Sequence, residues 1–300
     1  MPTLHYRQVD VFTDRPFAGN PLVVVLDADA LDTTDLARLA RQFDLSQTAF
    51  PMVATPAEKA AGADYRLRVF TPWTERAFAG HASIGAAWVL AKAGRIPAGP
   101  VRQACAAGVL SLDVGATGGP VCLTGAAPVV GDVEDAATLL AAASLPPASA
   151  LAGAARTTGA GNAFHLLPLA DDRDVLRAAP DLAAVRALEA LHGVEGLDVF
   201  TWDAEARTAH SRVFSTASGS GESAAAGSAA LALGAWLVAD GRLAADGMSQ
   251  FTVWQGVEIG RPSRLECTVV AEGGLAVECR VSGSVVLVAS GEIHRPPSRR

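Results

Sequence analysis

Two short segments carry residues whose types and spacing could do chemistry. In each, a glycine and a polar residue open a long apolar segment, Gly80-His81 in the first and Gly227-Ser228 in the second. If both segments are helices, their first turns expose backbone N–H groups and the positive end of the helix dipole. Two such starts facing one cleft would bind a carboxylate. Alternatively, both glycines only allow tight entry into a packed helix.

His81 is a titratable side chain at one of these starts. A helix N-terminus lowers the pKa of a histidine and favours the neutral imidazole, which can act as a base. His81 is therefore a candidate proton-transfer residue, although a structural hydrogen-bonding role is the alternative. The other histidines lack this setting and are expected to be structural or at the surface: His5, His165, His192, His210 and His294.

Composition argues against nucleic acid and membrane partners. The formal charge is −7, and the 24 lysines and arginines form no cluster or stripe, so no phosphate-binding surface is expected. The longest apolar run, Ala229 to Ala239, is shorter than the roughly 20 residues of a membrane helix. The N-terminal residues Met1 to Arg7 show no signal-peptide pattern, so a cytoplasmic protein is expected.

No metal or organic cofactor is expected. The cysteines form no C-x-x-C pair and are expected to be buried, reduced thiols, and the histidines form no H-x-H or H-E-x-x-H motif. Ser218 to Ala224 contains a G-x-G-x-x-A pattern, but Asp240 follows at the end of a helix rather than of a strand, so a dinucleotide turn is rejected. The four cysteines are Cys105, Cys122, Cys267 and Cys279.

The sequence repeats itself once, which predicts two similar halves. Three anchors recur in the same order, at offsets of 142, 144 and 147 residues. They are Gly19–Val25 with Gly161–Leu167, Arg68–Thr71 with Arg212–Ser215, and Gly80–Ile84 with Gly227–Leu231. We expect one half over residues 1–128 and another over 129–281, joined through a Gly- and Pro-containing linker around Gly125 to Val133.

Hydrophobic patterning predicts the elements within each half. Alternation at Tyr6–Phe12 and Arg66–Phe70 is typical of strands with one buried face. Thr33 or Thr34 is predicted to cap an amphipathic surface helix with apolar positions at Leu36, Leu39, Ala40 and Phe43.

The segments from Ala82 and from Ala229 are apolar on nearly every side, with Gly94 and Gly241 placed just after their ends. A helix without a polar face must be enclosed. The pattern favours an α+β fold in which a curled sheet surrounds a central helix, made twice.

Several motifs resemble the PhzF-like isomerases of phenazine biosynthesis over nearly the whole chain. They are Val9–Pro21, Phe70–Pro72, Phe78–His81, Gln255–Ser263 and Gly283–Val285. The resemblance implies the diaminopimelate-epimerase-like fold, with two pseudo-symmetric halves that each hold a central helix, in a homodimer without metal or cofactor. It also implies that residues 282–300 join the first half.

The chain departs from this family's pattern at two acidic positions. The family's proton-transfer glutamate lies in a Ser-Glu-Thr segment, which here is Ser46-Gln47-Thr48, and Ser223 stands in place of an aspartate in the segment Glu222–Ala229. An amide has no ionisation in the accessible pH range and cannot shuttle a proton. Isomerisation of the phenazine precursor dihydro-hydroxyanthranilate is therefore not expected.

Two functional interpretations remain open. The first is a cofactor-independent isomerase that moves protons on a small unsaturated amino or imino acid in a bacterial secondary-metabolite pathway, for example a double-bond shift in a 4-alkyl-proline (antibiotic) pathway. The second is a catalytically silent binding or scaffolding protein. The catalytic candidates are His81, Gln47 and Glu222, and the substrate-binding candidates are Ser46, Gly80, Ser223, Gly227 and Ser228.

Overall fold

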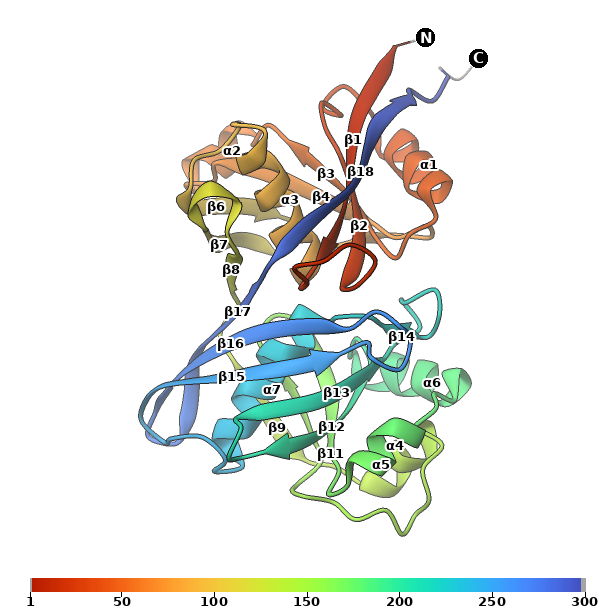
Figure 1. Cartoon of the computed structure of the whole chain (residues 1–300), viewed down its shortest axis with the longest axis vertical. Helices are drawn as coiled ribbons and strands as arrows, with labels where there is room; N and C mark the ends of the chain where they lie inside the picture. Colours follow the sequence, from red (N-terminus) through yellow and green to blue (C-terminus); the bar gives the residue numbers. More distant parts are fainter. Residues whose placement is uncertain (1, 298–300) are drawn as a thin grey trace. The chain divides into compact units, whose positions relative to one another are not determined.

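The chain forms two structural units, and the first is built from both ends of the sequence. In the computed structural model, which describes residues 2–297, unit 1 comprises Met1–Leu123 and Ser282–Arg300, and unit 2 comprises Thr124–Val281. Both ends of the chain lie in unit 1, where the first and last strands run side by side (Figure 1).

Unit 1 is a mixed sheet in the order β18-β1-β2-β3-β4-β6-β7-β8. The pairs β2/β3 and β4/β6 are parallel and the other neighbours are antiparallel. Its elements are β1 (Thr3–Val11), β2 (Asn20–Val25), α1 (Thr33–Phe43), β3 (Thr48–Met52), α2 (Pro56–Ala60), β4 (Tyr65–Phe70), β5 (Glu75–Arg76), α3 (Gly80–Lys92), β6 (Gly99–Cys105), β7 (Gly108–Val114), the 3-10 turn Ala116–Gly118, β8 (Val121–Thr124) and β18 (Val285–His294).

Unit 2 repeats this arrangement in the order β9-β10-β11-β12-β13-β15-β16. Here β11/β12 and β13/β15 are the parallel pairs. Its elements are β9 (Val129–Val133), α4 (Ala136–Ala142), β10 (Arg156–Gly159), β11 (Ala163–Pro168), α5 (Asp172–Arg177), α6 (Leu182–His192), β12 (Leu197–Asp203), β13 (Thr208–Phe214), β14 (Glu222–Ser223), α7 (Gly227–Ala239), β15 (Gly247–Gln255), β16 (Ser263–Glu272) and β17 (Leu275–Gly283).

The shared order of pairings confirms the internal duplication. In unit 1 the strand before the central helix, β4, pairs with the two-residue strand β5 and runs parallel to β6, the strand after the helix. In unit 2 strand β13 pairs with the two-residue strand β14 and runs parallel to β15 in the same way. One expectation was wrong: Val129–Val133 is not a linker but strand β9, which pairs with β10.

Each unit encloses one helix, as the uniform apolar patterning predicts. Every residue of α3 from Gly80 to Leu90 is buried, as is every residue of α7 from Gly227 to Val238. Helix α3 packs against β1, β2, β3 and β7, and α7 against β9, β10, β11 and β16. Gly94 and Gly241 have φ values of +67° and +68° just after the two helices, which confirms the predicted helix ends.

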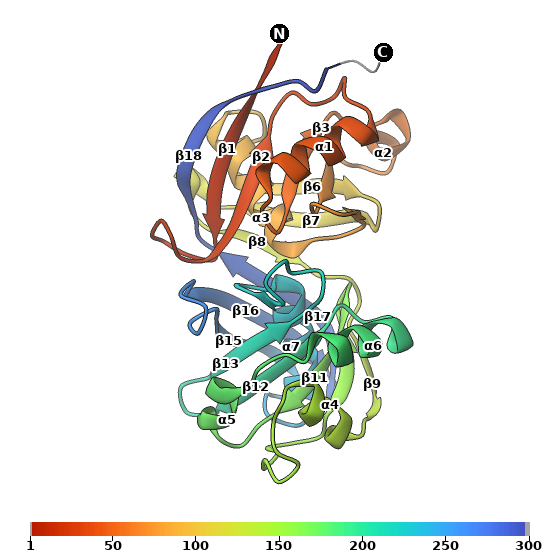
Figure 2. The same ribbon diagram turned by 90° about the vertical axis from the view of Figure 1, so that its right-hand side faces the viewer.

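The remaining helices cover the sheets from outside (Figure 2). Helix α1 places Leu36, Leu39 and Ala40 against side chains of β2 and β3, as its periodicity predicts. Its N-cap is Asp32, whose carboxylate accepts the N–H of Asp35 at 2.9 Å, rather than the predicted Thr33 or Thr34. In unit 2, α4, α5 and α6 share an apolar cluster with β11 and β12.

Two further expectations concern the burial of the cysteines and the lack of a membrane helix. All four cysteines are thiols outside any disulfide, as expected, but only Cys267 and Cys279 are buried, while Cys105 and Cys122 are half-buried. Among the helices of residues 2–297, none combines the length and apolar character that a bilayer span requires.

Candidate active site

The loop after β1 is held by the chain segment that returns at the end of the sequence. The N–H groups of Phe12 and Thr13 both donate to the carbonyl of Ser284, at 2.8 and 3.3 Å. Phe12 is fully buried, and a Cβ on Gly283 would lie 2.3 Å from its ring. Two motifs far apart in sequence therefore form one structure, because only glycine allows the ring to approach this strand.

This loop also delivers Asn20 to the segment before β3. Gly19 adopts φ +67°, and a Cβ there would lie 2.4 Å from the carbonyl of Val11, so the turn requires glycine. Asn20 opens β2, and the Ser46 hydroxyl lies 3.4 Å from its Oδ1. The carboxylate of Asp10 accepts the N–H of Phe17 at 2.8 Å and braces the loop. The turn at Gly19 thus places Asn20 beside Ser46, the residue that precedes Gln47.

Gln47 and Thr48 carry buried polar atoms that no other described residue satisfies. Within residues 2–297, neither Oε1 of Gln47 nor Oγ1 of Thr48 has a hydrogen-bond partner. A buried polar group left unpaired costs about 1–3 kcal/mol. Native structures rarely keep such groups without a partner, so Gln47 and Thr48 remain candidates for contact with a ligand or water.

His81 shows the same property at the start of α3. It is the second residue of the helix, its exposed fraction is 6%, and its Nε2 has no partner among the described residues. Burial lowers the pKa of His81 to about 4, so the imidazole is neutral at pH 7. Ala79, the N-cap residue, provides no side-chain cap, which leaves first-turn N–H groups available to a ligand.

In unit 2 the start of α7 is held by a chain of buried hydrogen bonds. The N–H of Ala226 donates to Oε1 of Gln255 at 2.7 Å, and Nε2 of Gln255 donates to the Ser211 hydroxyl at 3.0 Å. Ser211 in turn donates to Oδ1 of Asp198 at 2.6 Å. This relay links strands β12, β13 and β15 to the residue before the helix.

Gly256 completes the support of this helix start. It has φ +71°, and a Cβ there would lie 2.5 Å from the carbonyl of Ala224. The N–H of Arg261 donates to the Gly256 carbonyl at 2.8 Å, which closes the turn after β15. The Gln255–Ser263 motif therefore positions the residues that lead into α7.

Asp198 ends the relay as a buried acid. Burial raises the pKa of Asp198 to about 7, although the hydrogen bond from Ser211 acts in the opposite direction. Its Oδ2 has no partner within residues 2–297. Asp198 is therefore an acid that titrates near neutral pH inside unit 2.

The structure gives Glu222 a structural partner instead of a free carboxylate. Nε and Nη2 of Arg212 donate to its two oxygens at 3.0 and 2.7 Å, in a buried bidentate pair. Nη1 of Arg212 donates to the carbonyls of Val175, Leu176 and Ala178 at the end of α5. Because both oxygens of Glu222 are engaged, we do not retain it as a proton carrier.

The remaining candidates lie at the two helix starts. Gly80 is the first residue of α3, and Gly227 and Ser228 are the first two of α7, all buried. Ser223 lies in β14, opposite Val213.

Sequence reasoning missed Asn20, Thr48, Asp198, Ser211, Arg212 and Gln255. Asn20 and Gln255 stand in motifs that carry the family resemblance, Thr48 in the segment Ser46–Thr48 and Arg212 in a repeated anchor, whereas Asp198 and Ser211 stand in no such motif.

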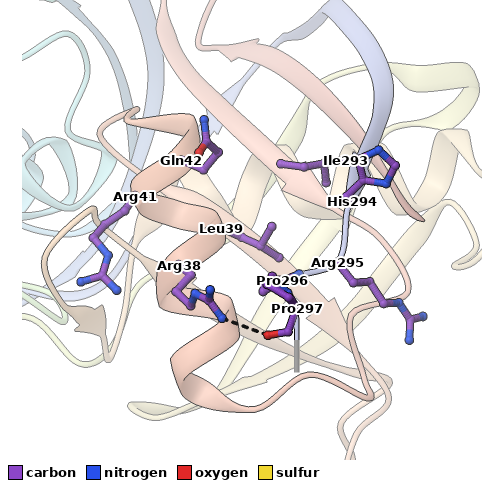
Figure 3. Close-up of a pocket in the computed structure, with 9 residues that line it drawn as sticks. All are labelled: Arg38, Leu39, Arg41, Gln42, Ile293, His294, Arg295, Pro296 and Pro297. Atoms are coloured by element: carbon purple, nitrogen blue, oxygen red, sulfur yellow. Dashed lines mark hydrogen bonds between the residues drawn. The ribbon is translucent and has the colours of Figure 1, made fainter. Parts of the chain in front are cut away.

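A separate surface pocket of about 660 Å³ lies between α1 and the end of β18 (Figure 3). Nη1 of Arg38 donates to the carbonyl of Pro297 at 3.3 Å, while the side chains of Arg41 and Arg295 point to opposite sides. The guanidinium groups do not converge, so the pocket is no anion site. It is lined by Arg38, Leu39, Arg41, Gln42, Ile293, His294, Arg295, Pro296 and Pro297, which include no predicted site residue.

Comparisons with known proteins agree with this architecture. A family model described as phenazine biosynthesis-like protein matches residues 9–291. An uncharacterized isomerase of Mesorhizobium japonicum is 33% identical over 317 aligned positions, covering 98% of this chain and 99% of the relative. A trans-2,3-dihydro-3-hydroxyanthranilate isomerase of Pseudomonas chlororaphis is 31% identical over 293 positions, covering 96% and 99%.

A solved structure of a PhzF-family protein from Bacillus anthracis superposes with a TM-score of 0.85, at 24% identity, covering 98% of this chain and 100% of that one. The predicted diaminopimelate-epimerase-like fold is thereby confirmed.

Proposed function

Because the chain belongs to the phenazine biosynthesis-like family, we propose that it is an isomerase that moves a proton on a small carboxylate-bearing substrate, with no cofactor. The observation that carries this proposal is His81, a buried neutral imidazole whose Nε2 has no protein partner within residues 2–297. A neutral imidazole with a free ring nitrogen can take a proton from carbon and return it elsewhere.

The start of α3 supports carboxylate recognition beside that imidazole. First-turn N–H groups and the helix dipole favour an anion, and no side chain caps the helix. Gln47 has an amide that could donate to a carboxylate, and Ser46 adds a hydroxyl. In this role Gln47 orients the substrate and does not carry the proton. In unit 2 the proposed substrate-binding residues are Gly227 and Ser228 at the start of α7 and Ser223 in β14.

The proposed substrate class is an unsaturated amino or imino acid of bacterial secondary metabolism. Removing a proton next to a double bond that is conjugated with an imine or carboxyl group spreads the negative charge onto nitrogen or oxygen, which lowers the basicity required of the catalytic group. A cyclic 4-alkyl-proline precursor satisfies this requirement.

We propose that dihydro-hydroxyanthranilate is not the substrate, although relatives at 31% and 30% identity carry that isomerase activity in their names. Gln47 occupies the position of the family's glutamate, and general acid–base catalysis is typically worth about 10²- to 10⁴-fold. Conversion of dihydro-hydroxyanthranilate, followed by absorbance, should be at least about 100-fold slower than with a glutamate-containing relative. A comparable rate would refute this assignment.

Proton transfer is tested by solvent exchange. The protein is incubated in D₂O with a panel of unsaturated amino and imino acids, and deuterium uptake at carbon is followed by NMR. Uptake should be lost in His81→Gln and retained in His294→Gln, an exposed histidine that serves as the control. Exchange that survives His81→Gln would contradict the role of His81.

The second candidate function, a silent binding protein, is favoured by the replacement of two acids by Gln47 and Ser223. Under that function a carboxylate ligand would bind, as measured by calorimetry, while no panel member exchanged a proton. Binding and exchange therefore separate the two functions.

A further inference from the structure

Three side chains of unit 2 that are far apart in sequence meet at one point. Glu134 lies in the turn between β9 and α4, His165 is in β11, and His192 is the last residue of α6. One ligand atom from each lies within 4.8 Å of the other two. We propose that Glu134, His165 and His192 form a binding site for a divalent transition-metal ion of the zinc class.

The three side chains lie close enough to share one ion, which would replace the hydrogen bond that now joins His165 to Glu134. Nδ1 of His165 is 2.7 Å from Oε2 of Glu134, and Nδ1 of His192 is 3.5 Å from Oε1 of Glu134. Ligand atoms bonded tetrahedrally to zinc at roughly 2.0–2.1 Å lie about 3.4 Å apart. Small rotations of the Glu134 and His192 side chains would bring the three atoms to that spacing.

One side of the site is buried and the other is accessible to solvent. His165 is fully buried and its ring contacts that of His192 edge-to-face, with 4.9 Å between centroids. The side chains of His192 and Glu134 are 37% and 18% exposed. An ion could therefore enter past His192, and water could complete its coordination.

Thr157 orients the carboxylate of Glu134. Its hydroxyl donates to Oε1 of Glu134 at 2.9 Å and lies 3.1 Å from Nδ1 of His165. Ligating carboxylates are commonly held by such outer hydrogen bonds, which fix their orientation.

The ligand set selects the class of ion. Imidazole nitrogen suits zinc, cobalt and nickel, whereas magnesium and calcium prefer oxygen ligands alone. Two imidazoles and one carboxylate therefore favour Zn²⁺, Co²⁺ or Ni²⁺. The ion would cross-link the β9–α4 turn, strand β11 and the end of α6, which argues for a structural role in unit 2.

The test uses the untagged full-length protein, first dialysed against a chelator. Zn²⁺ binding is measured by calorimetry, and Co²⁺ binding by its visible absorption. We expect one equivalent of either ion, and no binding of Mg²⁺ under the same conditions. The melting temperature should rise with zinc, since a ligand that binds only the folded state stabilises it.

Variants locate the ion. His192→Ala and Glu134→Gln change partly exposed side chains, and each should weaken binding at least about tenfold. His5→Ala in unit 1 and His210→Ala, which removes the histidine paired with Glu258 at 2.8 Å, are controls that should bind as the unmodified protein does.

Three outcomes would overturn the site. The first is the lack of a stoichiometric ion, and the second is an affinity that His192→Ala leaves unchanged. The third is a thiolate-to-cobalt charge-transfer band, which would assign the ion to the cysteine thiols.

Discussion

His81 and Asp198 are both buried, and burial favours the neutral form of each side chain. The consequences have opposite signs, because one group is neutral when it has lost a proton and the other when it holds one. The pKa of His81 falls to about 4, and that of Asp198 rises to about 7. Stability should therefore depend on pH through both groups, in opposite directions.

His81 should make the protein less stable in acid. Its folded pKa is below the unfolded value of 6.5, so the unfolded state binds more protons between pH 6.5 and about 4. The free energy of unfolding should fall across this interval by up to about 3 kcal/mol. In His81→Gln this component should vanish, as measured by urea denaturation at pH 7.5 and 4.5. The same pH dependence in variant and parent would contradict the pKa of His81.

Asp198 should act in the other direction. Its folded pKa is raised above the unfolded value of 3.8, so its stabilising contribution is present in acid and is lost as pH rises from about 4 to 7. Asp198→Asn keeps the acceptor for Ser211 and removes the ionisation. The variant should gain stability relative to the parent between pH 5 and 8, by up to about 3 kcal/mol. Denaturant midpoints at both pH values measure this difference, and a constant offset would refute it.

The position of His81 at the start of a buried helix could be predicted from the sequence, whereas the relay that ends at Asp198 could not. A histidine at the start of an apolar segment can be recognised from the sequence without knowledge of the fold. The Ser211 contacts to Asp198 and Gln255 instead depend on the register of β12, β13 and β15, which no local pattern encodes. Likewise, Glu222 was named as a catalytic candidate without its partner, because the β13–β14 pairing that brings Arg212 to it is not visible in the sequence.

Elements repeat between the units more faithfully than residues do. Both central helices were predicted from their lack of a polar face, because an enclosed helix needs none. Strand β9 was missed because Val129–Val133 contains Gly131 and Asp132, which are poor strand formers. The Asp32 cap was missed because three residues that can each cap a helix, Asp32, Thr33 and Thr34, follow one another there.

The Arg212–Glu222 pair joins β13 and β14 to the end of α5, and its loss should destabilise unit 2. Arg212→Gln leaves Glu222 as a buried charge without its partner, which typically costs about 3–5 kcal/mol. Arg173→Gln is the matched control, since Arg173 pairs with Asp171 at the surface, where solvent screening leaves such pairs with little effect on stability. Chemical denaturation should separate the two variants. Equal effects would show that burial does not govern this pair.

At the scale of the whole molecule, unit 1 depends on the last strand of the chain. β18 pairs with β1 from Thr3↔His294 to Val11↔Val285, and Ser284 anchors the loop at Phe12. The family resemblance implied that residues 282–300 return to the first half. The local sequence pattern of β18 could not have predicted it, because that pattern does not indicate which strand β18 joins.

A chain that ends at Gly283 should therefore lose order in unit 1 alone. Without β18, strand β1 lacks one neighbour and the Phe12 loop lacks its acceptor. Hydrogen exchange followed by mass spectrometry should show reduced protection in peptides from β1 and β2. Peptides from α7 and β13 serve as the internal control and should stay protected. Full protection of β1 in the shortened chain would contradict this dependence.

The discontinuity of unit 1 also bears on the order in which a newly synthesised chain can fold. Domains generally fold as they emerge from the ribosome, the N-terminal one first. Here Thr124–Val281 is a continuous stretch, so unit 2 can be complete while unit 1 still lacks Ser282–Arg300. Unit 1 is translated first but completed last, and until β18 pairs with it, strand β1 has an open edge that chaperones or neighbouring nascent chains could bind.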